Sequence, residues 1–167
     1  MTLDELNSAP RDVAERELGA CCGSARWSAA ISARRPFESA EQLYTAADAV
    51  WRSLDRSDWL EAFGHHPRIG DRASGWARDE QSASRDASAE TRRRLVELNH
   101  EYERRFGYVF LIFATGKTAP EILASLERRM RNDADTELRV AADEQAKITR
   151  LRLERLLQHD TAASRTT

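Results

Sequence analysis

Apolar side chains recur every three or four positions along most of this chain, which is the period of an amphipathic α-helix. The pattern is clear from Leu43 to Leu54 and again from Leu95 to Phe106. Capping sequences precede several such stretches: Thr2-Leu3-Asp4-Glu5, Ser39-Ala40-Glu41-Gln42 and Thr118-Ala119-Pro120-Glu121. We therefore expect helices at about residues 2–10, 10–22, 24–34, 39–54, 57–63, 88–106, 118–130 and 136–157.

One stretch departs from this period. Tyr108 to Ala114 is a short, continuous apolar run of the kind found in buried strands. A single strand would have no partner in an otherwise helical chain, so we expect a buried extended segment or a helical turn. The polar stretch from Arg72 to Ser88 is either a linker or carries a short helix at Asp79-Glu80-Gln81.

Together these elements predict an all-α fold, a single-domain bundle of about eight helices. Residues 1–158 form the helical domain, and residues 159–167 are expected to be a disordered C-terminal tail. A chain of 167 residues is long enough to bury one hydrophobic core.

Composition narrows the functional classes. The 26 basic and 28 acidic residues give a formal net charge of −2, without the basic excess of a nucleic-acid-binding protein. The longest apolar run, Val109 to Ala114, is too short to span a membrane. The acidic N-terminus lacks the apolar region of a signal peptide, so we expect a cytoplasmic protein. Adjacent Cys21 and Cys22 favour buried thiols over a disulfide, and no ligand spacing indicates a metal.

The most distinctive loop is Phe63 to Asp71, which contains His66 followed by Pro67. Proline fixes its own φ and disfavours the helical conformation of the preceding residue, while Gly64 and Gly70 allow the chain to bend. A short, rigid loop with an imidazole is suited to presenting an acid or a base. The alternative is a helix-ending turn whose histidines and arginine are solvated.

The last predicted helix contains an arginine in its apolar face. At roughly 100° per residue, Arg152 falls about 40° from both Ile148 and Leu156. Such an arginine must extend to solvent, pair with a carboxylate or face a cavity that accepts an anion. Arg155 lies nearby on the helical wheel and is a competing candidate for that role.

Glu80 and Gln81 are a second candidate pair, because a carboxylate beside an amide can accept from and donate to a polar ring. They are equally consistent with an exposed pair in the first turn of a helix. Asn99 and Tyr102 lie on the inner side of the long helix, where polar packing within the core is the simpler explanation.

Several segments, in order along the chain, resemble the 2-oxo-4-hydroxy-4-carboxy-5-ureidoimidazoline (OHCU) decarboxylase family of urate breakdown. Each segment is weak alone, but the ordered set is specific and extends from about residue 3 to residue 157. The matching segments are Leu18 to Trp27, Arg35-Pro36-Phe37, Asp58 to Phe63, His66 to Gly70, Gly75-Trp76, Glu80-Gln81, Leu98-Asn99, Tyr102, Phe106 to Tyr108, Lys147-Ile148 and Leu151 to Leu153.

The resemblance implies an all-α, dimeric enzyme that needs neither a metal nor an organic cofactor and converts OHCU to (S)-allantoin and CO2. By matched segment, His66 is the proton donor, Pro67 lines the site, and Glu80 and Gln81 hold the substrate ring. Arg152 reaches the substrate from the last helix. The backbone of one segment contacts the ring: Phe110, Leu111, Ile112, Phe113 and Ala114.

One position departs from the family pattern. The family usually has a serine three residues before the glutamate, and this chain has Ala77. A hydrogen bond to the substrate is then missing, or is supplied by Ser74 or by water, which would affect affinity more than the type of reaction.

Two other classes remain open. His65, His66, Asp71 and Glu80 are a possible hydrolytic metal site, although their spacing matches no usual ligand set. A non-catalytic helical interaction domain is the other class; it would have an exposed apolar face and an inaccessible region around His66.

Overall fold

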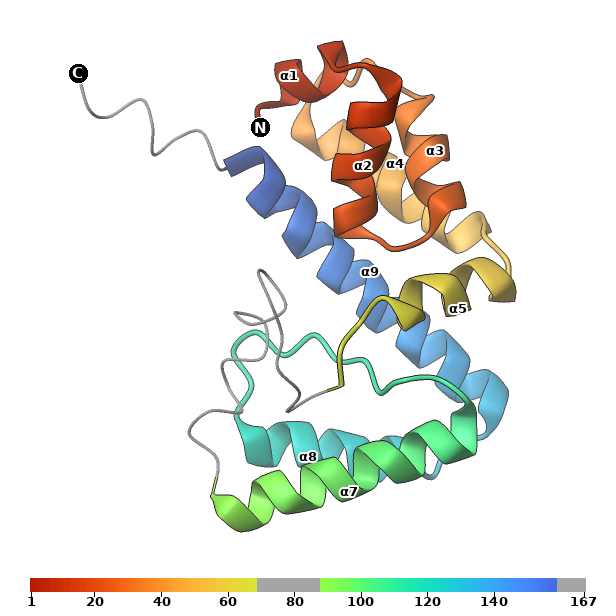
Figure 1. Ribbon diagram of the computed structural model, residues 1–167, viewed down its shortest axis with the longest axis vertical. Coiled ribbons are helices and arrows are strands. Elements are labelled where there is room, and N and C mark those ends of the chain that lie inside the picture. The colour runs from red at the N-terminus through yellow and green to blue at the C-terminus, as the bar shows by residue number, and fades with distance from the viewer. Residues whose placement is uncertain (69–87, 159–167) are drawn as a thin grey trace, which may run out of the picture. The chain divides into compact units, whose positions relative to one another are not determined.

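The computed structural model describes residues 1–68 and 88–158, and these parts of the chain are all-helical, with no strand. Figure 1 shows the eight helices of these ranges. None of them is long and apolar enough to cross a membrane. They are α1 (Leu3–Ser8), α2 (Arg11–Cys21), α3 (Ala25–Ser32), α4 (Ala40–Ser53), α5 (Arg56–Gly64), α7 (Ala89–Phe106), α8 (Ala119–Arg129) and α9 (Ala134–Gln158). The all-α prediction is confirmed, and each expected helix is present within a few residues of its predicted ends.

The helices begin where the capping sequences indicated. Thr2 and Thr118 each accept a hydrogen bond from the backbone N–H three residues later, and Glu5 and Glu121 return the bond to the cap residue. These are complete capping boxes, which satisfy two otherwise unpaired backbone donors. At α4 only half of the expected box forms, because the side chain of Gln42 accepts from the N–H of Glu38 instead of the cap residue.

The chain divides into two compact units. The first contains Met1–Ala62 and the residues from Ala146 onward. Its core holds Trp27, whose indole N–H donates to the carbonyl of Ala47 at 3.0 Å. In this unit α3 packs against both α2 and α4. Cys21 and Cys22 are both buried thiols that form no disulfide, as expected.

The second unit contains Phe63–Gln145. Helices α7 and α8 lie side by side, and the connection between them runs back along the pair to the start of α8 (Figure 1). Gly107 ends α7 in the left-handed conformation, with φ of 84°, where a residue without Cβ is favoured. The rings of Tyr102 and Phe110 then meet edge to face, with centroids 5.3 Å apart.

The apolar run Tyr108 to Ala114 is part of this connection and adopts neither helix nor strand. Five of its seven residues are buried: Tyr108, Phe110, Leu111, Ile112 and Ala114. The expectation of a buried, irregular segment is thus confirmed in its non-helical form. The short helix expected at Asp79-Glu80-Gln81 and the expected tail of residues 159–167 lie outside the described residues.

Candidate active site

The histidine loop begins where α5 ends at Gly64. The backbone N–H of His66 donates to the carbonyl of Phe63 at 3.1 Å, which forms a tight turn immediately before Pro67. His66 and Pro67 are half-buried, whereas His65 is exposed. Of the two histidines, therefore, His66 is the one that the fold partly encloses.

The imidazole of His66 is held by an amide from a distant part of the sequence. Its Nε2 lies 2.7 Å from Oε1 of Gln145, and Gln145 is fully buried on α9. An amide oxygen only accepts hydrogen bonds, so Nε2 is the ring nitrogen that carries a hydrogen in this pair. The geometry therefore selects one neutral form of the imidazole.

A second contact holds Arg68, two residues further along the same loop. The guanidinium of Arg68 makes a bidentate ion pair with Glu103 of α7. Its Nε donates to Oε1 at 2.5 Å, and its Nη2 donates to Oε2 at 2.9 Å. Both side chains retain contact with solvent. This ion pair attaches Arg68 of the loop to α7.

The segment from Phe110 to Ala114 is held by two charged side chains. The backbone N–H of Phe113 donates to Oε2 of Glu144 at 2.6 Å. The carbonyl of Leu111 accepts from Arg129 at 2.6 Å. The backbone that the family resemblance assigns to substrate contact is therefore positioned by side chains of α8 and α9.

Arg129 itself belongs to a buried polar network. It pairs with Glu137 at 2.6 Å, and the two side chains are 5% and 0% exposed. The carboxylate of Glu137 also accepts from the hydroxyl of Tyr102 at 2.5 Å and from the amide of Asn132 at 2.9 Å. Burial, followed by the bond to Glu137, raises the pKa of Tyr102 far above its usual value, so this phenol stays a neutral donor.

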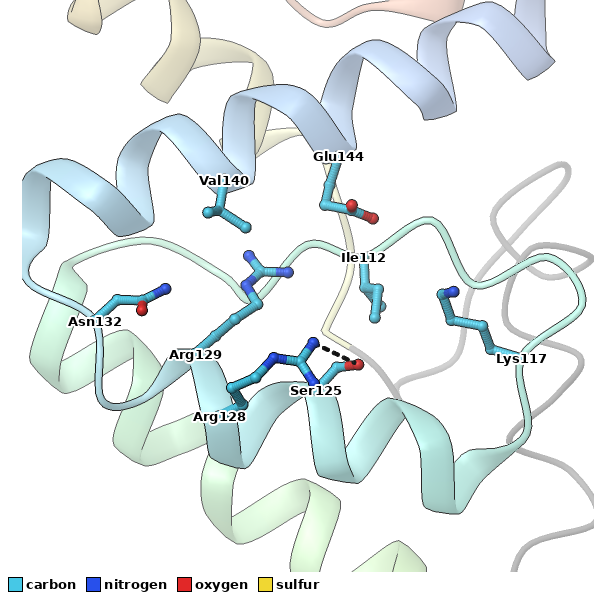
Figure 2. A pocket seen from close by; sticks show the side chains of 8 residues that line it. All are labelled: Ile112, Lys117, Ser125, Arg128, Arg129, Asn132, Val140 and Glu144. Atoms are coloured by element: carbon cyan, nitrogen blue, oxygen red, sulfur yellow. Dashed lines mark hydrogen bonds between the residues drawn. The ribbon is translucent and has the colours of Figure 1, made fainter.

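A cavity of about 330 Å³ opens beside this network (Figure 2). Glu144 of α9 and Lys117 of the connection before α8 both line it, and Arg128 donates to the hydroxyl of Ser125 at 3.5 Å on its α8 side. Among the described residues that the sequence predicted for the site, Ile112 lines this cavity. The cavity also shares Glu144 and Arg129 with the supports of the 110–114 segment.

Arg152 lies in the first unit and is 9% exposed, which confirms that it occupies the apolar face of its helix. Its positive charge affects the pKa of the Cys22 thiol. Burial raises the pKa of Cys22 to about 11, and the hydroxyl of Thr149 and the charge of Arg152 partly oppose that rise. By contrast, Arg150, two residues earlier, pairs at the surface with Glu41 and Glu154. Arg155 is half-buried.

The predicted site residues are thus distributed. His66, Pro67 and the Phe110–Ala114 segment belong to the second unit, and Arg152 to the first. Ala77, Glu80 and Gln81 lie outside the described residues, as does Asp71 of the alternative metal site. Within residues 1–68 and 88–158, no three histidine, cysteine or acidic side chains form a group suited to a metal ion.

Sequence reasoning missed the side chains that support the site, Gln145, Glu144 and Arg129. A signal for Gln145 was present, because at roughly 100° per residue it falls about 20° from Arg152 on the helical wheel. Two polar residues separated by one heptad in an apolar face are both candidates for a function. Glu144 and Arg129 had no such signal, since their importance comes from contacts with distant backbone groups.

Comparison with known proteins gives the same family from independent data. The sequence model of the OHCU decarboxylase family matches residues 7–154. The chain is 38% identical over 154 residues to the uric acid degradation bifunctional protein TTL of Arabidopsis thaliana, covering 87% of this chain and 48% of TTL. It is 33% identical over 137 residues to 2-oxo-4-hydroxy-4-carboxy-5-ureidoimidazoline decarboxylase of Mus musculus, covering 77% of each.

A solved structure of OHCU decarboxylase in the presence of (S)-allantoin is also similar. Its TM-score is 0.78 at 37% identity, covering 84% of this chain and 96% of that one. The chain spans only about half of TTL and, at 32%, about a third of the bifunctional protein PucL of Bacillus subtilis (strain 168). Because the family match extends over nearly the whole chain, this protein belongs to the OHCU decarboxylase family.

Proposed function

We propose that this protein catalyses the decarboxylation of OHCU to (S)-allantoin and CO2, a carboxy-lyase reaction of urate degradation. The observation that carries the proposal is the family match over residues 7–154. The likeness to an OHCU decarboxylase solved in the presence of (S)-allantoin supports the choice of substrate and product. The proposal covers this activity alone and not the second activity of the longer bifunctional relatives.

The reaction requires little chemistry from the protein. The bond from C4 to the carboxylate breaks, CO2 leaves, and the electron pair moves into the adjacent C5=N bond of the ring. The C4 hydroxyl then becomes the carbonyl of allantoin as C5 takes up one proton. No electron sink such as pyridoxal phosphate is required for that step. The protein must orient the carboxylate, stabilise charge on the ring and add one proton to one face of C5, the carbon that bears the ureido group.

In this scheme His66 is the proton donor. General acid catalysis by a positioned side chain contributes roughly 10²–10⁴ in rate. After donation, the neutral imidazole regains a proton from solvent, which its half-buried position allows. Delivery to one face accounts for a single enantiomer, whereas spontaneous decay gives the racemate.

The other roles follow the matched positions. Arg152 and the N–H groups of residues 110–114, except that of Phe113, which donates to Glu144, stabilise negative charge on the substrate. Glu80 and Gln81 hold the ring, with Glu80 taking part in catalysis, while Pro67 and Ala77 line the site. We further propose a cytoplasmic homodimer that acts without metal or organic cofactor and binds neither nucleic acid nor membrane.

The test couples three reactions in one cuvette. Urate is oxidised by urate oxidase, the product is hydrolysed by hydroxyisourate hydrolase, and optically active allantoin is followed by circular dichroism. We expect rapid appearance of the (S) signal, unchanged by EDTA. His66→Ala should reduce kcat by about 10² or more with the fold retained.

His65→Ala is the matched control, because it removes the neighbouring, exposed imidazole from the same loop. We expect this variant to keep wild-type activity. An active His66→Ala protein would contradict the assignment of the proton donor, and no acceleration by the wild type would contradict the proposed reaction. The molar mass measured by light scattering after size-exclusion chromatography tests whether the protein is a dimer.

A further inference from the structure

We propose that Gln145 is a positioning residue that keeps the hydrogen of His66 on Nε2, so that Nδ1 is the atom that exchanges the proton with the substrate. This inference rests on the proposed function and adds which atom acts and what orients it. It starts from a single contact, the 2.7 Å separation between Nε2 of His66 and Oε1 of Gln145.

Gln145 is well suited to hold a ring in a fixed orientation. It is 0% exposed, it lies on the 25-residue helix α9, and both partners belong to the same compact unit. A buried amide oxygen needs a hydrogen-bond donor. The imidazole N–H lies 2.7 Å away and is such a donor, which holds the ring in this orientation.

The contact is compatible with both charge states that catalysis requires. In the imidazolium both ring nitrogens carry hydrogen, and Nε2 donates to Gln145. When Nδ1 gives up its proton, Nε2 still donates to the same oxygen, so the ring is not released between donation and reprotonation. Histidines that bind metals use the same device, in which a partner on one nitrogen fixes the role of the other.

The neutral charge of the amide matters as much as its position. A carboxylate in place of Gln145 would stabilise the imidazolium and raise the pKa of the imidazole. An amide orients the ring without that electrostatic bias, which leaves the proton easier to transfer. We therefore expect glutamine to be required here as a neutral acceptor, with glutamate as a poor substitute despite its similar shape.

The preceding residue of α9 supports the other predicted substrate contact. Glu144 accepts the backbone N–H of Phe113 at 2.6 Å, so two consecutive residues hold the histidine ring and the 110–114 segment. Side chains of neighbouring helical residues diverge by about 100°, which allows one turn to reach two separate segments.

The first test is spectroscopic and needs no activity. The chain has four histidines, and the ¹⁵N signals of His66 are identified by their loss in His66→Gln. In the wild type at high pH, we expect Nε2 to show the shift of a protonated nitrogen and Nδ1 that of an unprotonated one. In Gln145→Met, which removes the acceptor at similar volume, the two forms should mix.

The second test is the pH dependence of decarboxylation. Gln145→Glu should move the descending limb of the kcat profile upward by about one pH unit, because the added carboxylate favours the imidazolium. Gln145→Met should lower kcat by about 10- to 100-fold with little change in KM, as for other orienting partners. Gln158→Glu adds the same charge at an exposed position of the same helix and should leave the profile unchanged.

The outcomes are separable. A neutral wild-type imidazole with hydrogen on Nδ1, or an unchanged tautomer in Gln145→Met, would overturn the role of Gln145. The expected tautomer in a protein that does not accelerate decarboxylation would support that role and overturn the proposed function. Because the tautomer is read in the wild type and only the assignment needs His66→Gln, the inference stays testable even if a Gln145 variant fails to fold.

Discussion

Two stretches of the second unit lack regular secondary structure and carry groups assigned to the site, yet they are held differently. The 110–114 segment is fixed by charged side chains, Arg129 on a carbonyl and Glu144 on an N–H. The described part of the histidine loop is held at His66 by the neutral amide of Gln145 and at Arg68 by an ion pair with Glu103.

The difference follows from what each stretch must do. A backbone that only has to stay in place tolerates charged side chains as supports, since the backbone itself does not change charge during the reaction. A side chain that must gain and lose a proton is better oriented by a neutral partner, because a charged one would favour a single protonation state. In this unit, therefore, the kind of support matches the chemistry assigned to the group it holds.

The largest effect on stability is expected from the buried ion pair between Arg129 and Glu137. Glu137→Gln leaves Arg129 buried beside a neutral amide and should lower the free energy of unfolding by about 3–5 kcal/mol. Urea denaturation followed by circular dichroism measures the loss. Glu41→Gln, which breaks the exposed pair with Arg150, is the matched control and should cost less than about 1 kcal/mol. Equal losses in both variants would refute the distinction.

A buried group that stays uncharged gives a smaller, pH-dependent effect. The pKa of Cys22 is raised to about 11 by burial, so the folded state holds the thiol proton after the unfolded state has lost it. Stability is then fully present below the unfolded pKa of about 9 and falls by about 1.4 kcal/mol per pH unit up to about 11.

The measurement is a set of denaturation curves between pH 8 and pH 10.5 for the wild type and for Cys22→Ala. The alanine variant should show a shallower decline over this range. Parallel curves would mean that the thiol ionises equally in both states.

The smallest effect is expected at the exposed end of the histidine loop. Arg68→Met keeps much of the side-chain length but removes the pair with Glu103, and should cost less than about 1 kcal/mol of stability. Denaturation at low and high salt tests this directly, because screening should shrink the difference between variant and wild type. A loss as large as that of Glu137→Gln would show that the loop depends on charge after all.

Local sequence rules predicted the helices well because their causes are local. Capping residues such as Thr2 and Thr118 lie within four positions of the groups they satisfy, and apolar periodicity marks the buried face. The same rules identified His66 through its neighbouring proline, and Arg152 through its place on an apolar face. The site residues between 69 and 87 stay predictions.

The supporting contacts were beyond such rules because they join distant positions. His66 and Gln145 are 79 residues apart, and the sequence around one residue does not indicate that the other is its partner. The amide of Gln42 gives a second, local example, because its oxygen accepts from the N–H of Glu38 and not from that of the expected cap residue, Ser39. Which of two chemically equivalent donors is used depends on the folded geometry.

One consequence follows from the adjacency of Glu144 and Gln145. Two groups held by separate elements move independently, so the distance between them varies. Groups held by adjacent residues of one helix move together, and the distance between them varies less. Consecutive Cα atoms are held about 3.8 Å apart by covalent geometry, so residues 144 and 145 hold their two partners in this way. Thermal motion of α9 therefore displaces the imidazole and the 110–114 backbone in step, so the alignment between them tolerates motion of the helix.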